Sequence, residues 1–98
     1  MKITRSQEGS SLVLKLEGRL DTNTAAQLET ELKGIDQEYS SLIFDFGALE
    51  YLSSAGLRVL LAAHKEMNKH GQMIVRNPNE MVLEILEMTG FLDFLTVE

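Results

Sequence analysis

The sequence predicts an α/β fold, in which a mixed, mostly parallel β-sheet begins with an antiparallel hairpin and packs against α-helices. Three observations predict it. Alternation typical of strands and spacing typical of helices follow one another in the order β-β-α-β-α-β-α. Residues 42–46 are apolar at almost every position, as in a strand that is covered on both faces. The 98 residues contain no linker-like segment, so we expect a single domain over residues 1–98.

The first elements are a hairpin and a helix. Residues 2–6 alternate in polarity, residues 7–10 have turn chemistry, and leucines alternate with other residues over 12–17. We expect Gly18 to end the second strand and Asp21 or Thr22 to cap the first helix. The apolar positions of this helix are Ala25, Leu28, Leu32 and Ile35, and Gly34 lies near its end.

The second half of the chain predicts two further strand–helix units. After the strand at 42–46, residues 47–52 are expected to connect to a helix over about 54–69, which Gly71 ends. A parallel-type strand covers 73–75, and Pro78 suits the start of a third helix, which Gly90 terminates. Residues 91–95 are expected to pack back on the body. The methionines predicted to fill the core are Met67, Met73, Met81 and Met88.

Composition excludes several classes of function. Nine basic and 15 acidic residues give a net charge of −6, which disfavours binding to nucleic acid or to anionic membranes. The absence of Cys excludes disulfides, thiolate zinc sites and cysteine nucleophiles, and two His make a His-rich metal site unexpected. No apolar stretch is long enough to span a bilayer and the first ten residues do not resemble a signal peptide, so we expect a cytoplasmic protein.

The junction before the second predicted helix is the strongest candidate site. Ser53 and Ser54 stand where backbone N–H groups are free and the helix macrodipole is positive, an arrangement that accepts a phosphate. Ala55 and Gly56 are small and leave the approach open, while Arg58 lies one turn further and is expected to reach a phosphate on Ser54. Ser is also a common N-cap, so a purely structural role is the alternative interpretation.

Asp21 has a similar double interpretation. It is a good N-cap, and if its loop lies beside that of Ser54 it is also placed to hold Mg²⁺ or to bond the Ser hydroxyl. Asp45 resembles a phospho-acceptor only in lying near a strand end, and His64 is expected to be half-buried with its hydrogen bonds satisfied. No set of nucleophile, base and orienting group can be assembled, so we do not expect an enzyme.

These residues resemble a known family. Residues 51–61, together with Phe44-Asp45-Phe46 and Leu49, are similar to the signature of STAS domains, specifically of bacterial anti-sigma factor antagonists. Residues 18–21, followed by Ala25 and Leu28, are similar to the family's first strand–helix junction, and residues 89–91 to the end of its third helix. The resemblance covers essentially the whole chain.

The resemblance implies a partner switch. The unphosphorylated antagonist binds an anti-sigma factor that is also a serine kinase, which frees a sigma factor; phosphorylation stops the binding, and a metal-dependent phosphatase of the PP2C type reverses it. Alignment on Gly56-Leu57 places the acceptor at Ser54. Family members often carry Asp before the acceptor; here Ser53 occupies that place, which keeps it as a second candidate. ATP and Mg²⁺ belong to the kinase, so no cofactor is expected on this chain.

The partner-binding surface implied by the resemblance surrounds the acceptor. Its residues are Asp21, Thr22, Ser53, Ala55, Gly56, Leu57 and Arg58, and helical spacing places Leu57 on the inner stripe of the second helix with Leu60, Leu61 and His64. Two alternatives remain: a STAS subunit of a lipid-transport ATPase complex or signalling scaffold without a phospho-switch, and a small phosphoryl-transfer enzyme that uses Ser54 covalently. The oligomeric state is left open by the sequence.

Overall fold

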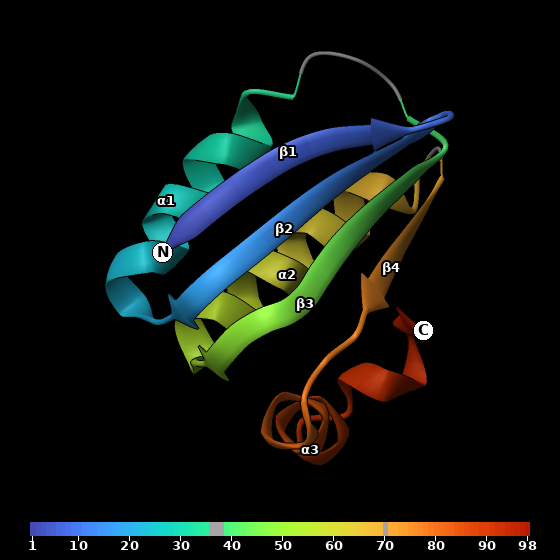
Figure 1. Ribbon diagram of the computed structural model, residues 1–98. Coiled ribbons are helices and arrows are strands. Elements are labelled where there is room, and N and C mark those ends of the chain that lie inside the picture. The colour runs from blue at the N-terminus through green and yellow to red at the C-terminus, as the bar shows by residue number, and fades with distance from the viewer. Residues whose placement is uncertain (36–38, 70) are drawn as a thin grey trace.

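The computed structural model describes residues 1–35, 39–69 and 71–98, and it contains one five-stranded sheet in the order β1-β2-β3-β4-β5 (Figure 1). The strands are β1 (Lys2–Glu8), β2 (Ser11–Leu20), β3 (Ser41–Leu52), β4 (Gln72–Arg76) and β5 (Thr96–Val97). β1 pairs with β2 antiparallel, and each later pair is parallel. The predicted fold class, a mixed sheet with an N-terminal antiparallel hairpin, is confirmed.

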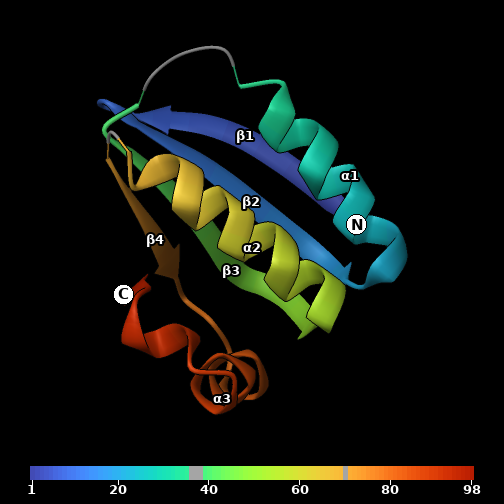
Figure 2. The same cartoon turned by 180° about the vertical axis from the view of Figure 1, so that it is seen from behind.

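Helices α1 (Thr22–Lys33) and α2 (Ser54–Met67) lie on one face of the sheet, the face toward the viewer in Figure 2. Helix α3 (Glu80–Met88) and the 3₁₀ helix η1 (Phe91–Asp93) follow β4. Side chains from successive strands, such as Leu14, Phe44 and Val75, are fully buried under these helices. Val82 and Leu86 bring α3 into the same core. Burial of this apolar surface is the main force that holds the helices on the sheet.

Strands β2 and β3 extend well past the ends that the sequence predicts, and β1 also continues from residue 6 to Glu8. Gly18 does not end β2, and residues 47–52 are part of β3 rather than a connection. The parallel register shifts between Gly18 and Arg19, and Gly18 has a φ of 106°, which is accessible to Gly and strained for other residues. The irregularity therefore bends the β2–β3 pair without ending it, so both strands continue to Leu20 and Leu52.

The C-terminal elements also differ in detail from prediction. α3 begins at Glu80 behind the N-cap Asn79, so Pro78 precedes the helix instead of starting it, and α2 ends at Met67. The tail packs back as predicted, through Leu95, but it forms η1 and the short strand β5. The prediction that Met81 and Met88 fill the core is wrong, because their side chains are 51% and 78% exposed. The helical spacing that buries Val82 and Leu86 turns both methionines outward.

The opposite face of the sheet, toward the viewer in Figure 1, carries a second small cluster formed by Val13, Ile43 and Ile74. An ion pair joins Arg76 in β4 to Glu8 in β1, with Arg76 Nη1 3.3 Å from a Glu8 carboxylate oxygen. The ion pair joins β1 to β4, and the Val13–Ile43 pair of β2 and β3 lies between the two residues in the strand register. Val13 and Ile43 are each only 5% exposed, although neither α1 nor α2 covers this face. The hydrogen bond to Glu8 also raises the pKa of Arg76.

Candidate functional site

Two strand–helix junctions lie next to each other at the carboxyl ends of β2 and β3. Leu20 pairs with Leu52, and the backbone N–H of Ser53 donates to the carbonyl of Leu20 over 2.9 Å. One residue earlier, the Arg19 guanidinium lies 4.4 Å from the centroid of the Tyr51 ring, a cation–π contact between the same strands. The expected juxtaposition of the Asp21 loop with the Ser54 loop is therefore confirmed.

Ser53 is the N-cap of α2. Its backbone is extended, and its hydroxyl oxygen accepts a hydrogen bond from the backbone N–H of Gly56 at 3.2 Å. Its carbonyl accepts from Leu57 N–H, which closes the first helical turn. The half-buried Ser53 hydroxyl therefore caps the helix, as the preference of Ser for N-cap positions predicts.

Ser54 is the first residue of α2 and, unlike Ser53, does not cap the helix. Its side chain is exposed, and its hydroxyl makes no hydrogen bond to any of the residues that the structure describes. The first turn of α2 contains no acidic residue. An anion on this oxygen would lie at the positive end of the macrodipole, close to backbone N–H groups that lack helical partners.

Gly56 fixes how closely α2 approaches the sheet. A Cβ at this position would lie 2.7 Å from Cγ of Leu20 and 3.0 Å from Cδ1 of Leu52. Both leucines are fully buried, so the backbone of the first helical turn packs directly on them. This contact sets the height of Ser54 above the strand ends.

Asp21 is occupied as the N-cap of α1. Its carboxylate accepts hydrogen bonds from the backbone N–H groups of Asn23 and Thr24 at 3.0 Å each, and Thr24 Oγ1 accepts from the Asp21 N–H at 2.8 Å. The bond from the Thr24 N–H is the main cause of a lowered pKa for Asp21. The carboxylate is thus turned to its own helix. No group of three or more potential metal-ligating side chains occurs in residues 1–35, 39–69 and 71–98.

The lowered pKa of Asp21 predicts a pH-dependent contribution to stability. A carboxylate whose pKa is depressed on folding stabilises the fold above its unfolded pKa of about 3.9, and the contribution disappears as pH falls through the folded value. Asp21→Asn keeps a capping oxygen without the charge, so we expect the free energy of unfolding of wild type and variant to converge in that acidic range. Urea unfolding over a pH series measures the difference; a gap that stays constant down to about pH 2 contradicts the assignment.

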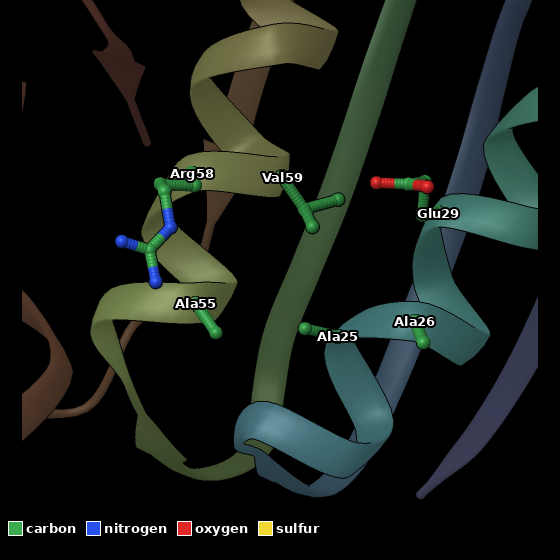
Figure 3. A pocket seen from close by; sticks show the side chains of 6 residues that line it. All are labelled: Ala25, Ala26, Glu29, Ala55, Arg58 and Val59. Carbon is green, nitrogen blue, oxygen red and sulfur yellow. The ribbon is translucent and has the colours of Figure 1, made fainter.

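A groove of about 330 Å³ runs between α1 and α2, and Ala55, the residue after Ser54, is among those that line it (Figure 3). Small side chains of Ala25, Ala26, Ala55 and Val59 line it, and Glu29 and Arg58 stand at its borders. Arg58 is exposed and forms no ion pair within the described part of the chain. Its guanidinium lies on the side of α2 away from α1 and turns back toward the first turn of the helix (Figure 3).

The predicted site residues differ in how far their side chains are exposed. Thr22, Ser54 and Arg58 are exposed, whereas Asp21, Ser53 and Ala55 are half-buried. Leu57 lies on the inner side of α2, as its helical spacing predicts: it is 8% exposed and belongs to the core, so it is not an exposed apolar contact residue. Leu57 therefore does not contact a partner directly; it packs beneath the exposed residues at the start of α2.

Two weaker candidates take no part in this site. Asp45 accepts a hydrogen bond from the backbone N–H of Gly47 at 2.9 Å. His64 is half-buried as predicted, with its ring centroid 4.8 Å from that of Phe94. Its hydrogen bonds are not satisfied as expected, because the buried Nδ1 has no partner among the residues described.

The groove itself was not predicted. Its signal in the sequence is the pair of alanines at 25 and 26 opposite Ala55 and Val59. Small side chains on two facing helices leave a shallow surface channel, but only the packing of α1 beside α2 shows that these positions face one another. The structure also shows no helix, among the residues it describes, of the length and apolarity that a bilayer span requires.

Comparison with known proteins gives concordant matches. The sequence profile of the STAS domain matches residues 2–98. BtrV of Bordetella bronchiseptica, described as an anti-sigma factor antagonist, is 34% identical over 99 residues, which cover 99% of this chain and 85% of that protein. An anti-sigma factor antagonist from Mycobacterium paratuberculosis superposes with a TM-score of 0.90 at 22% identity, over 98% of this chain and 83% of that one.

SpoIIAA of Bacillus has been solved in two forms that are both similar in structure. The unphosphorylated anti-sigma factor antagonist superposes with a TM-score of 0.83 at 21% identity, over 99% of this chain and 88% of that one. The phosphorylated form superposes with a TM-score of 0.75 at 18% identity, over 99% and 91% of the two chains. At these identities the solved structures establish a shared fold.

Proposed function

The chain belongs to the STAS domain family and, within it, to the anti-sigma factor antagonists; from that premise we propose that its unphosphorylated form binds an anti-sigma factor and so releases a sigma factor. The anti-sigma factor acts as a serine kinase that phosphorylates Ser54, and this modification ends the binding. A PP2C-type phosphatase restores the unmodified form. The chain itself is a cytoplasmic binding module and not an enzyme.

The observation that carries the proposal is the contrast between two adjacent hydroxyls. Ser53 Oγ accepts the capping hydrogen bond from Gly56, whereas Ser54 is exposed and its hydroxyl is free within the described residues. A kinase transfers the γ-phosphoryl group of ATP to an accessible Ser oxygen; the Oγ–P bond forms, ADP leaves with the bond to the γ-phosphorus broken, and the hydroxyl proton is lost. Ser54 meets that requirement without disturbing the cap of α2, which favours it over Ser53 as the acceptor.

The surroundings of Ser54 suit a partner interface. The groove that includes its neighbour Ala55 is lined mainly by small apolar side chains and has room for an apolar side chain of the partner. A phosphate adds about −1.5 to −2 charges at its edge. In a dry interface this charge must lose water, and it repels any acidic group of the partner, so binding is lost without a change of fold.

Phosphosite mapping tests the acceptor. The chain is incubated with the anti-sigma factor of its own organism, ATP and Mg²⁺, and the modified residue is located by mass spectrometry. We expect one phosphate on Ser54 in the wild type and none in Ser54→Ala. Ser53→Asn is the matched control, because Asn removes the hydroxyl and keeps an N-cap acceptor; it should be phosphorylated like the wild type. Phosphate on Ser53, or continued modification of Ser54→Ala, contradicts the assignment.

Arg58 is expected to moderate the switch. Its guanidinium turns toward the first turn of α2 and is free to pair with a phosphate on Ser54, which would hide part of the new charge. In Arg58→Ala the loss of partner affinity on phosphorylation should therefore increase, by up to about fivefold for an exposed pair.

Two measurements check this role of Arg58. Calorimetric titration of the anti-sigma factor with both forms of each variant gives the affinity ratio, and ³¹P NMR follows the second ionisation of the phosphate, near pH 6. Arg58→Ala should raise that phosphate pKa, whereas Lys65→Ala, on the same helix but away from Ser54, should leave it unchanged. An unchanged affinity ratio in Arg58→Ala shows that Arg58 does not shield the phosphate.

A further inference from the structure

Helix α3 presents an apolar stripe that the proposed switch does not use. Met81 and Met88 are 51% and 78% exposed, and with Phe94 they are the exposed large hydrophobic side chains of the described residues. The two methionines lie seven residues apart, which places them two turns apart on one side of the helix. Ile85 lies between them on that side and is half-buried. In Figures 1 and 2, α3 is the helix seen end-on beside the sheet.

The charge around this stripe is strongly one-sided. Residues 77–98 contain five carboxylates and no Lys, Arg or His, so they hold most of the net charge of −6. Glu80, Glu84 and Glu87 are exposed on α3 itself. Within the described chain, the ion pair recorded for this segment joins Glu98 to Arg76, over 3.8 Å, and it leaves the carboxylates of α3 without a cationic partner.

The apolar stripe and the negative charge together indicate which kind of molecule could bind to this face of α3. A second copy of the chain meeting the same face would bring the carboxylates of two α3 helices together, and like charges in contact oppose association. A partner with cations beside an apolar stripe would neutralise the glutamates and cover the methionines. Methionine side chains are flexible and polarisable, and they adapt to helices of different sequence.

We propose that α3 is a docking surface for a basic amphipathic helix of a partner protein. Apolar residues of that helix pack on Met81, Ile85 and Met88, and its Lys and Arg side chains meet Glu80, Glu84 and Glu87. The surface lies on a different helix from Ser54, so it provides a second contact that is independent of phosphorylation. The proposal does not depend on the identity of the partner that reads Ser54.

The test uses the full chain, labelled with ¹⁵N, and a defined probe: a Leu/Lys peptide with leucines at helical spacing, compared with a scrambled peptide of the same composition. We expect the amphipathic peptide to shift the backbone amides of α3 and η1 and the scrambled peptide to bind at least about tenfold more weakly. Met81→Gln/Met88→Gln should weaken binding about tenfold by removing apolar contact. Glu84→Gln/Glu87→Gln should weaken it and reduce its salt dependence.

Matched controls separate this surface from general attraction to an acidic protein. Glu31→Gln/Glu50→Gln removes the same charge from α1 and β3 and should change the affinity less than about twofold, and Ser54→Glu should not weaken it. Circular dichroism checks that each variant is folded. The proposal is overturned by equal binding of the scrambled peptide, by equal effects of the two charge variants, or by amide shifts centred away from α3. A dimer in sedimentation that Met81→Gln/Met88→Gln dissolves also overturns it, in favour of a second copy.

Discussion

Phosphorylation of Ser54 is expected to weaken binding of the anti-sigma factor by at least about 100-fold, which corresponds to about 2.7 kcal/mol. The reason is the position of the hydroxyl, which is exposed at the first residue of α2, next in sequence to Ala55 in the groove that we propose as the contact surface. A dianion there must be desolvated in the complex, or it must hold the two proteins apart. Isothermal titration with the unmodified and the phosphorylated chain measures the ratio.

Variants of Ser54 serve as controls for the affinity loss. Ser54→Ala should bind like the unmodified protein, and Ser54→Glu, with one charge, should lose about tenfold. The fold should remain intact, because negative charge at a helix N-terminus is stabilising by up to about 1 kcal/mol. A phosphorylated chain that melts at a lower temperature than the unmodified chain would attribute the loss of binding to unfolding and contradict the interface account.

Gly56→Ala is expected to destabilise the protein although it replaces Gly by the best helix former. The new Cβ would lie 2.7 Å from Cγ of the fully buried Leu20, and relieving that overlap costs about 1–3 kcal/mol. The gain in helix propensity, at most about 1 kcal/mol, recovers only part of it. Urea denaturation should therefore show a lower midpoint than that of the wild type.

Gly34→Ala is the matched control for this substitution. Its Cβ would make an ordinary contact of 3.4 Å with the Glu31 carbonyl, and Gly34 has a right-handed backbone conformation, so its stability should change little. If Gly56→Ala left the free energy of unfolding unchanged but weakened partner binding, Gly56 would belong to the interface. Packing against Leu20 would then not explain why Gly occupies position 56.

The order of the elements could be predicted from the sequence because each has a clear period. Leucines at 12, 14 and 16 alternate as β2 requires, and the spacing of Ala25 and Leu28 gives the buried side of α1. The ends of β2 and β3 could not be predicted in the same way. Gly18 and Gly47 suggest turns, but pairing of Leu20 with Leu52 carries both strands past them, which is a tertiary effect.

The features of the candidate site that depend on neighbouring residues in the sequence could be predicted. The residues next to each helix start predict a cap at Asp21 or Thr22 and a serine at the start of the second helix. The structure shows that Asp21 and Ser53 are the caps and that Ser54 is exposed. The burial of Leu57 follows from its helical spacing, whereas the outward side chains of Met81 and Met88 depend on how α3 is rotated against the sheet. The groove needs the relative placement of two helices, which no local pattern contains.

The most direct test of the partner switch is a pull-down from the native cell lysate with wild-type, Ser54→Ala and Ser54→Glu baits, compared by mass spectrometry. The account predicts that an anti-sigma factor of the serine-kinase type is recovered with wild type and Ser54→Ala and is strongly depleted with Ser54→Glu. Recovery of the same transporter or scaffold proteins by all three baits would contradict it: the fold assignment would stand, and the phospho-switch at Ser54 would not.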